Sequence, residues 1–161
     1  MKYLLVVILA CLSVPAVAQV EELEARVGTI SCAACFNLAI AGLKQTAGVA
    51  DVTGDMNNGW IRVGVNGKQG ISLKDAMERI RVAGFQDGGQ FTLIASGVLE
   101  QRGNKLVLVV PNQKEVFVVD PGDRAQMAEN SAASRSAVRA TGQLSGGGNQ
   151  YDLKIQKLQK Q

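Results

Sequence analysis

The sequence predicts an α+β protein in which a ferredoxin-like βαββαβ domain is followed by a small all-β barrel. Two observations carry this prediction. Up to about residue 91, the hydrophobic period switches in the order strand, helix, strand, strand, helix, strand. Beyond that point, strand-like runs separated by turn residues dominate, with one weak helical stretch among them.

The first eighteen residues (1–18) have the composition of a secretory signal peptide. Lys2 supplies the positive start, residues 3–12 are apolar, and an Ala-Val-Ala cleavage pattern precedes Gln19. The apolar run is too short to span a membrane as a helix. We therefore expect a secreted, periplasmic protein, and the alternative is a lipoprotein anchored at Cys11.

The ferredoxin-like domain is expected over residues 21–91. Leu23, Ala25 and Val27 alternate with polar residues, which indicates a strand with one buried face. Two helices are expected to cover one face of a four-stranded antiparallel sheet. The further elements are a helix over 34–46 with Gly48 as C-cap, a strand over 49–56, a turn at 57–59 (Asn-Asn-Gly), a strand over 60–65, a helix from N-cap Ser72 to Gly84, and a strand within 86–94.

The second half, residues 92–161, is predicted to be a five-stranded barrel of the oligonucleotide/oligosaccharide-binding (OB) type. No linker rich in proline or serine separates the halves, so the last strand of the first domain is expected to run almost directly into the barrel. The expected elements are strands over 91–101, 105–110 and 115–119, a weak helix over 123–133, and strands over 137–144 and 151–158.

Cys32 and Cys35 form a Cys-x-x-Cys pair between the first predicted strand and the first predicted helix. At a helix N-terminus, the helix dipole and free backbone N–H groups favour thiolate, the form that binds metal ions and attacks disulfides. The chain has no histidine, so this pair alone cannot complete a tetrahedral zinc site. Soft ions of low coordination number, Cu(I) or Hg(II), suit two sulfur ligands.

The stretch from Leu23 to Phe91 resembles the heavy-metal-associated (HMA) domain, the fold of periplasmic mercury-binding proteins and copper chaperones. The resemblance rests on the Cys-x-x-Cys pair, on Gly-Val-x-x-Val starting at residue 48, and on Ala-Gly-Phe ending at Phe85. It implies that Cys32 and Cys35 bind one soft ion and pass it to a partner. It also implies that Phe85 packs beside the metal loop.

Two residues depart from the family pattern. The places that usually hold Gly and Met ahead of the first cysteine hold Thr29 and Ile30. Ile30 fills a volume similar to that of methionine, and such exchanges in a core usually cost less than about 1.5 kcal/mol. Thr29 lacks the conformational freedom of glycine and is expected to stiffen the approach to Cys32.

Two other interpretations of the cysteine pair stay open. A strand, Cys-x-x-Cys and a helix also describe thioredoxin-like redox sites. That fold places a cis-proline against the cysteines, and residues 21–91 contain no proline. The pair could also be a purely structural disulfide, although so short a loop adds little stability.

The sequence contains no evident catalytic constellation, so we do not expect an enzyme. Aromatic residues are few, and the basic residues are scattered at a net charge of +3, which argues against a nucleic-acid partner. We expect a carrier or sequestering protein that passes Cu(I) or Hg(II) to a membrane metal transporter or another thiol-bearing acceptor. The alternative is an interaction module that keeps the fold without the ion and binds an envelope protein through its C-terminal domain.

Overall fold

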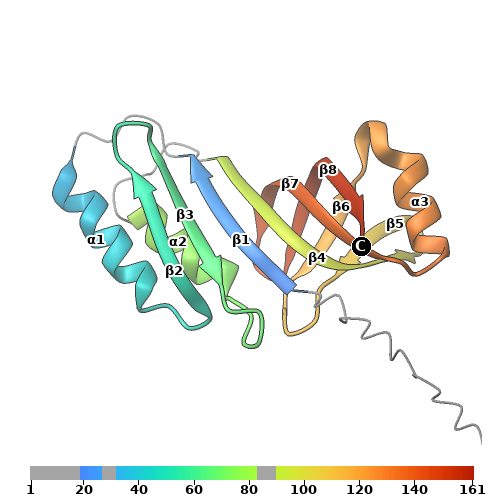
Figure 1. The fold of residues 1–161 in the computed structure, drawn as a ribbon, viewed down its shortest axis with the longest axis horizontal. Helices are drawn as coiled ribbons and strands as arrows, with labels where there is room; N and C mark the ends of the chain where they lie inside the picture. The colour runs from blue at the N-terminus through green and yellow to red at the C-terminus, as the bar shows by residue number, and fades with distance from the viewer. Residues whose placement is uncertain (1–18, 27–31, 83–89) are drawn as a thin grey trace, which may run out of the picture.

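The computed structural model describes residues 19–26, 32–82 and 90–161 (Figure 1). Within these ranges the chain forms eight strands, three α-helices and one short 3-10 helix. The strands are β1 (Gln19–Arg26), β2 (Val49–Asp55), β3 (Trp60–Val65), β4 (Gln90–Arg102), β5 (Lys105–Val109), β6 (Val116–Asp120), β7 (Ala137–Gly147) and β8 (Gln150–Lys160). The helices are α1 (Ala33–Lys44), α2 (Leu73–Val82), η1 (Gly122–Arg124) and α3 (Ala125–Ala133).

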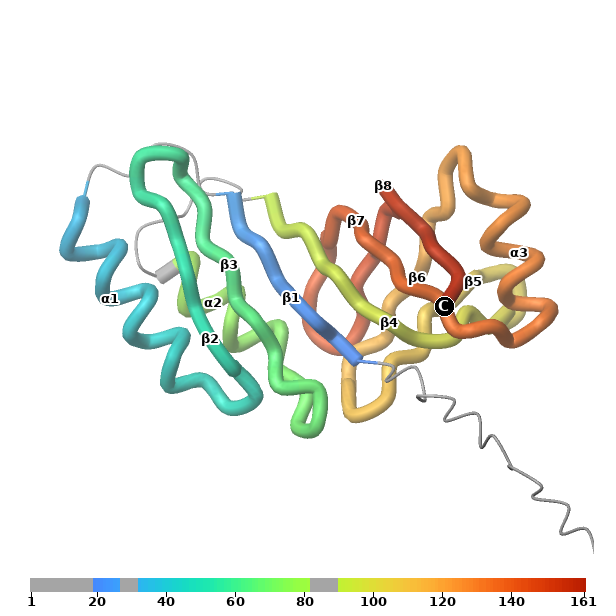
Figure 2. The backbone as a smooth tube through the Cα atoms, in the orientation of Figure 1, coloured from blue at the N-terminus to red at the C-terminus, as the bar shows by residue number. Residues whose placement is uncertain are grey.

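All eight described strands belong to one sheet, in the order β2-β3-β1-β4-β5-β6-β8-β7. A further antiparallel pairing of β4 with β7 closes β4, β5, β6, β8 and β7 into a barrel. The strands β1, β3 and β2 lie outside the barrel and continue from the first half of β4. Figure 2 shows β4 running from beside β1 into the barrel.

The predicted fold class, a ferredoxin-like domain followed by a barrel, is therefore wrong. The molecule is mostly β, and the cause lies in β4, which is one strand of 13 residues where two strands were expected. Residues 90–96 of β4 pair with β1, and residues 91–98 pair with β7 on the other edge. The outer strands and the barrel therefore belong to one sheet, in which β1 of the outer strands pairs directly with β4 of the barrel.

One hydrophobic core runs from beneath α1 and α2 into the barrel. The first part is filled from β1, β3 and the two helices, and the second from β5, β6 and β8. Its largest fully buried side chains are Leu23, Leu43, Ile61, Leu73, Ile80, Leu93, Leu99, Leu108, Phe117, Tyr151 and Leu153. The common core and the common strand β4 both show that the outer strands and the barrel pack as one unit.

The start of α2 is confirmed, because the Ser72 Oγ accepts a hydrogen bond from the Asp75 backbone N–H at 3.2 Å. The end of α1 differs from the prediction: Gln45 is its C-cap. Gly48 instead has φ 83°, and a Cβ atom there would collide with the carbonyl oxygen of Gly70. Gly48 therefore allows two turns to pack backbone to backbone, which requires glycine.

Loop 111–115 of the barrel is bonded to the start of α2. The side chain of Gln113 donates to the Ile71 carbonyl at 2.6 Å and accepts from the Ile71 N–H at 3.3 Å. The Glu115 carboxylate accepts from the Leu73 N–H at 3.1 Å, at the positive end of the α2 dipole. These bonds hold the barrel against α2, independently of the shared strand.

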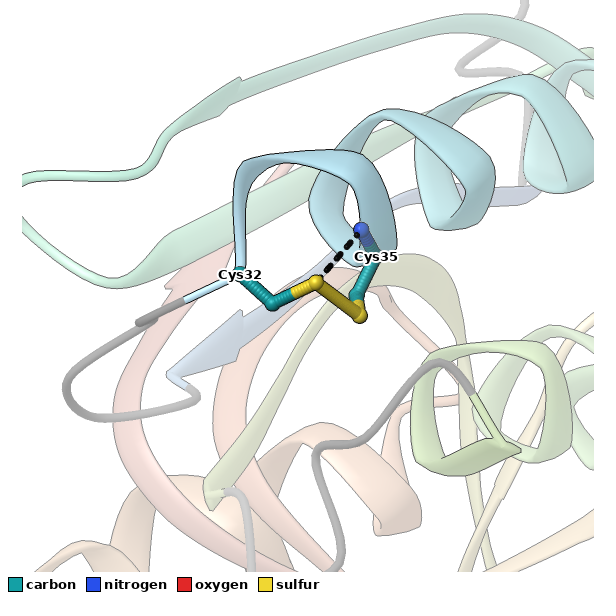
Figure 3. The surroundings of a disulfide bond; sticks show 2 residues. All are labelled: Cys32 and Cys35. Carbon is teal, nitrogen blue, oxygen red and sulfur yellow. Dashed lines mark hydrogen bonds between the residues drawn. A yellow bond between two sulfur atoms is a disulfide. The ribbon is translucent and has the colours of Figure 1, made fainter.

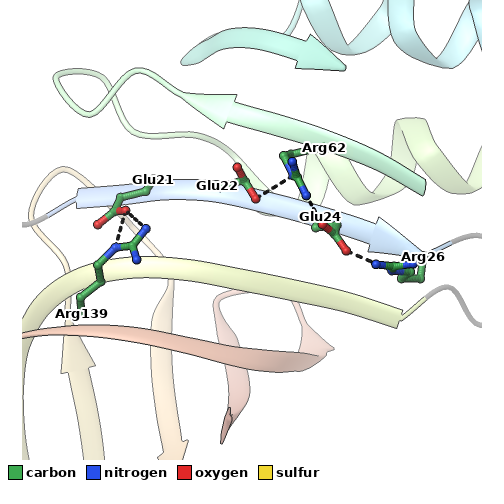
Figure 4. Close-up of polar contacts among 6 residues, drawn as sticks. All are labelled: Glu21, Glu22, Glu24, Arg26, Arg62 and Arg139. Atoms are coloured by element: carbon green, nitrogen blue, oxygen red, sulfur yellow. Dashed lines mark hydrogen bonds and ion pairs between the residues drawn. The ribbon is translucent and has the colours of Figure 1, made fainter. Parts of the chain in front are cut away.

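A second polar connection lies at a β-bulge in β1, between Val20 and Glu22 (Figure 4). The bulged residue Glu21 accepts hydrogen bonds from Ser96 on β4 and Arg139 on β7, each at 2.7 Å. Burial raises the pKa of Glu21, but the hydrogen bonds from Arg139 and Ser96 outweigh it and hold the pKa below its usual value. The ionised Glu21 therefore links three strands.

Candidate functional site

The cysteine pair lies where the chain enters α1 (Figure 3). Cys32 is the N-cap, with extended backbone (φ −117°, ψ 98°), and Cys35 lies in the first turn. The Cys35 backbone N–H donates to the Cys32 Sγ at 3.2 Å, so a sulfur atom occupies the place of the usual capping oxygen. The pair thus lies at a helix N-terminus, as the sequence pattern predicts.

The two cysteines are joined by a disulfide, with their Cα atoms 5.3 Å apart. Cys32 is exposed and Cys35 is half-buried. A thiol from another molecule can therefore reach the disulfide more easily at Cys32 than at Cys35. After reduction, the same backbone spacing leaves both sulfurs on one side of a single helical turn, where they can share one ion.

Phe36 and Ile40 anchor the first turns of α1 on β2. A Cβ atom at Gly54 would lie 2.7 Å from the Phe36 ring and 3.3 Å from the Ile40 side chain, so both side chains pack directly over the bare backbone of Gly54. Phe36 is a neighbour of the pair that the Cys-x-x-Cys pattern did not indicate. The signal that could have found it is Gly54 itself, because an isolated glycine within a strand indicates close approach.

The helix carries almost no charge of its own. Its first turn has no acidic residue, and its charged residue is Lys44 in the last turn. No carboxylate on α1 thus offsets the positive end of its dipole near the cysteines, a setting that favours thiolate over thiol after reduction.

Leu38 does not lie on the buried face of α1, although the helical period of residues 34–46 places it next to the apolar positions Ala39 and Leu43. Its side chain is 72% exposed, whereas Ala39 and Leu43 are buried. Leu38 lies one turn beyond Cys35, so an exposed apolar side chain stands beside the disulfide.

Other ligands do not gather at the pair within the described ranges. No group of three or more His, Cys, Asp or Glu residues there could hold a metal ion. Thr29, Ile30, Phe85 and Cys11 lie outside the described residues. The two sulfurs are the donors that the described residues place here, and once reduced they suit a soft ion of low coordination number.

A cleft of about 410 Å³ lies elsewhere, beside the contact between loop 111–115 and α2. Its lining combines charged residues (Lys74, Asp75 and Lys114) with apolar Ala47 and Ile71. Glu115 also lines it, but its carboxylate is bonded to the Leu73 N–H and to the Gln113 side chain. The cleft is therefore the space left where loop 111–115 meets the start of α2, and we do not assign it a ligand.

Comparison of the chain with protein-family models, curated proteins and solved structures found no match. In the part of the chain that the structure describes, no helix has the length and hydropathy needed to cross a membrane. The similarity to the HMA domain thus stays a prediction from the sequence pattern.

Proposed function

We propose that this protein binds one soft metal ion, Cu(I) or Hg(II), through reduced Cys32 and Cys35, and passes it to a thiol-bearing acceptor. The observation that carries this proposal is the placement of the pair. An exposed N-cap cysteine and a half-buried first-turn cysteine lie on a helix that Phe36 and Ile40 anchor. Two thiolates without a third ligand suit an ion that prefers two sulfurs.

Binding requires that the disulfide first be reduced. A dithiol reductant breaks the S–S bond, its own two sulfurs become a disulfide, and both cysteines become thiols. The ion then replaces the two thiol protons, and two S–metal bonds form. An exported protein meets an oxidising environment, so its metal-binding capacity would depend on such a reductant.

Transfer would proceed by ligand exchange. A thiolate of the acceptor approaches the ion beside the exposed Cys32, and the bonds to this protein's sulfurs are then released in turn. The acceptor could be a membrane metal transporter, and the uncharged start of α1 with the exposed Leu38 offers it a contact surface without charge repulsion. No step in this sequence is catalytic, so the proposal describes a carrier and not an enzyme.

The experiment is an anaerobic titration of the reduced, full-length mature protein with Cu(I) and Hg(II) against a competing thiol ligand. A one-to-one complex is expected, and it is expected to be lost in the Cys32→Ser, Cys35→Ser variant. The matched control is the oxidised wild-type protein, which has the same fold but no free thiols. Equal binding by the variant, or no binding by the reduced protein, would overturn the proposal and favour the envelope interaction module.

The disulfide also keeps a second candidate function open, thiol–disulfide exchange. It would be favoured if the reduced protein transferred its electrons to a disulfide substrate at a rate well above that of a free dithiol, without binding either ion. The same Cys32→Ser, Cys35→Ser variant serves as its control.

A further inference from the structure

The side of α1 that faces away from the core carries apolar side chains. Ala34, Leu38 and Ala41 are spaced i, i+4 and i+7, so they lie on one side of the helix, opposite the buried Ala39 and Leu43. All three are exposed, and Leu38, at 72%, is the most exposed large apolar side chain among the described residues. We name Ala34, Leu38 and Ala41 the outer face of α1.

The composition of α1 is that of a helix with contacts on every side. Its twelve residues include only two strongly polar side chains, Asn37 and Lys44. A helix that is apolar all round is usually buried all round. However, α1 lies at one end of the molecule, next to β2, the last strand of the sheet (Figure 1). The outer face therefore has the composition of a contact surface while it is exposed.

The outer face begins at the disulfide. Ala34 lies between the two cysteines in the sequence, and Leu38 lies about 4.5 Å along the helix axis beyond Cys35 (Figure 3). Cys32 is exposed, so the sulfur of another protein can reach it. Because that sulfur is surrounded by the other protein's own atoms, those atoms would come to lie over the first turns of α1. The protein that exchanges with the cysteine pair is thus the one expected to cover the outer face.

The size of the outer face fits a brief contact. From Ala34 to Ala41 it measures about 12 Å along the helix and about 10 Å across, or about 120 Å². A stable protein interface buries about 800 Å² on each partner. The face is therefore too small to hold a permanent subunit or a second copy of the chain by itself, but it suits a partner that arrives, exchanges and leaves.

The outer face also selects a partner surface without charge. No charged residue lies between Ala33 and Leu43. The cations near α1 are at its other end: Lys44 is in the last turn, and the Arg79 Nη1 atom lies 3.5 Å from where a Cβ atom of Gly42 would be. That end is about 10 Å along the helix from the cysteine pair, beyond the Debye length at physiological salt. Charge therefore contributes little to an approach at the outer face.

We propose that the outer face of α1 docks a protein whose thiol pair is bordered by aliphatic side chains, and that Leu38 makes the central contact. The inference rests on the proposed function, since the docked protein is the thiol-bearing acceptor. It adds the chemistry of the acceptor's surface, which is apolar and uncharged around its sulfurs. Exchange with such a partner is expected to depend on apolar area and not on salt concentration.

The test follows the disulfide and needs no metal ion, so it can be read even if neither ion binds. The probes are two reduced dodecapeptides with a Cys-x-x-Cys pair and the same net charge, one flanked by Leu and Ile and the other by Ser and Asn. A peptide thiolate attacks the Cys32 Sγ, the bond to Cys35 breaks, and Cys35 leaves as a thiolate. The second peptide thiol then attacks the mixed disulfide and releases Cys32, so the peptide is oxidised and the protein is reduced.

The measured quantity is the second-order rate constant with the oxidised mature protein. Wild type is expected to react about fivefold faster or more with the apolar peptide than with the polar one, at low and at high salt. Leu38→Ser is expected to slow the apolar peptide about fivefold and to change the rate of the polar peptide by less than about twofold. The intrinsic reactivity of each peptide cancels in the ratio of wild type to variant.

The chain offers a matched control in Met127, the other exposed large apolar side chain among the described residues, at 45%. Met127→Ser on α3 is expected to leave both peptide rates within about twofold of wild type. Leu38 and Met127 are both exposed, so neither variant is expected to lose the fold. Far-UV circular dichroism checks the fold, and the rate of reduction by dithiothreitol, which offers no docking surface, checks the disulfide itself.

Several outcomes would overturn the docking proposal. These are equal rates for the two peptides with wild type, and slowing of both peptides and of dithiothreitol alike by Leu38→Ser, which would place its effect on the disulfide. A wild-type dimer in sedimentation that is absent from Leu38→Ser would assign the face to a second copy of the chain. A selective effect of Leu38→Ser without binding of Cu(I) or Hg(II) would support the docking surface and end the proposed carrier function.

Discussion

The carboxylate of Glu21 on β1 and the guanidinium of Arg139 on β7 meet across β4 (Figure 4). Both Nε and Nη2 of Arg139 lie 2.7 Å from the Oε2 atom of Glu21. The other carboxylate oxygen accepts from the Ser96 hydroxyl, which in turn accepts from the Gln161 side chain at 2.8 Å. This cluster joins the outer strands to the closed barrel.

Replacing Glu21 is expected to lower the free energy of global unfolding and not only to loosen β1. Glu21→Ala should lower the free energy of unfolding by about 1–2 kcal/mol, because half-buried, charge-assisted hydrogen bonds are lost and the Ser96 hydroxyl loses its acceptor. Urea unfolding measures this change. The exposed Glu129→Ala on α3 is the control, and an equal effect of both variants would contradict the structural role of Glu21.

The same cluster predicts acid sensitivity. Glu21 has its pKa below the usual value in the folded state, so its contribution to stability is present above about pH 4.5 and is lost as the pH falls through the folded pKa. The difference in unfolding free energy between wild type and Glu21→Gln should therefore shrink between pH 7 and about pH 3. A constant difference over this range would show that the carboxylate charge does not carry the effect.

Glu22 should act in the opposite direction. Burial raises its pKa despite the Arg62 side chain 3.0 Å away, so its ionised form costs stability above the folded pKa, and protonation removes that cost. Glu22→Gln is accordingly expected to be neutral or slightly stabilising at pH 7, by up to about 1 kcal/mol. Thermal unfolding at pH 7 and pH 4 tests the sign, and clear destabilisation at pH 7 would count against it.

Gly54 is expected to be required for the placement of α1. A Cβ atom there would lie 2.7 Å from the Phe36 ring and 3.0 Å from the Trp60 carbonyl oxygen, so Gly54→Ala should destabilise by about 1–3 kcal/mol. Because Phe36 follows Cys35 directly, the disulfide should also be reduced faster by dithiothreitol. Gly147→Ala, where an added Cβ meets nothing within 4 Å, is the control. Unchanged stability and reduction rate in Gly54→Ala would refute this role.

Reduction of the disulfide should leave the fold intact. The bridge spans a sequence separation of three residues, so breaking it is expected to cost at most about 2 kcal/mol of unfolding free energy. If reduced Cys32 and Cys35 bind Cu(I) or Hg(II), ion at a hundredfold excess over Kd should raise the unfolding free energy by about 2.7 kcal/mol. Calorimetry of the reduced protein measures both effects, and the Cys32→Ser, Cys35→Ser variant should show no rise.

Most of the elements could be predicted from the sequence, because their signals are local. The turn at residues 57–59 is confirmed by the Asp55 carboxylate, which accepts from the N–H groups of Asn57 and Asn58 at 2.8 and 3.0 Å. Ser72 caps α2, and the cysteines lie at the start of α1. Each of these features depends on residues only a few positions apart, so periodicity and capping patterns detect them.

The fold class and the residues around the site could not be predicted in the same way. Periodicity predicts a strand within residues 86–94 and another over 91–101, whereas the structure has the single strand β4, both edges of which are paired. The exposure of Leu38 and the packing of Phe36 over Gly54 depend on how α1 lies on the sheet. The helical period identifies the apolar face of a helix, but it does not identify the strand or helix against which that face packs.

Local patterns along the chain indicate most of the helices and strands, the residues that alternate into a core, and the two sulfurs at the start of a helix. The pairing of β4 with both the outer strands and the barrel, and the contact of Glu21 at its bulge with Arg139, appear only in the folded molecule. Backbone preferences and side-chain periodicity act over a few residues, so they can be detected in the sequence. The pairing of strands and the packing of helices on a sheet depend instead on the free energy of contacts between segments far apart in the chain.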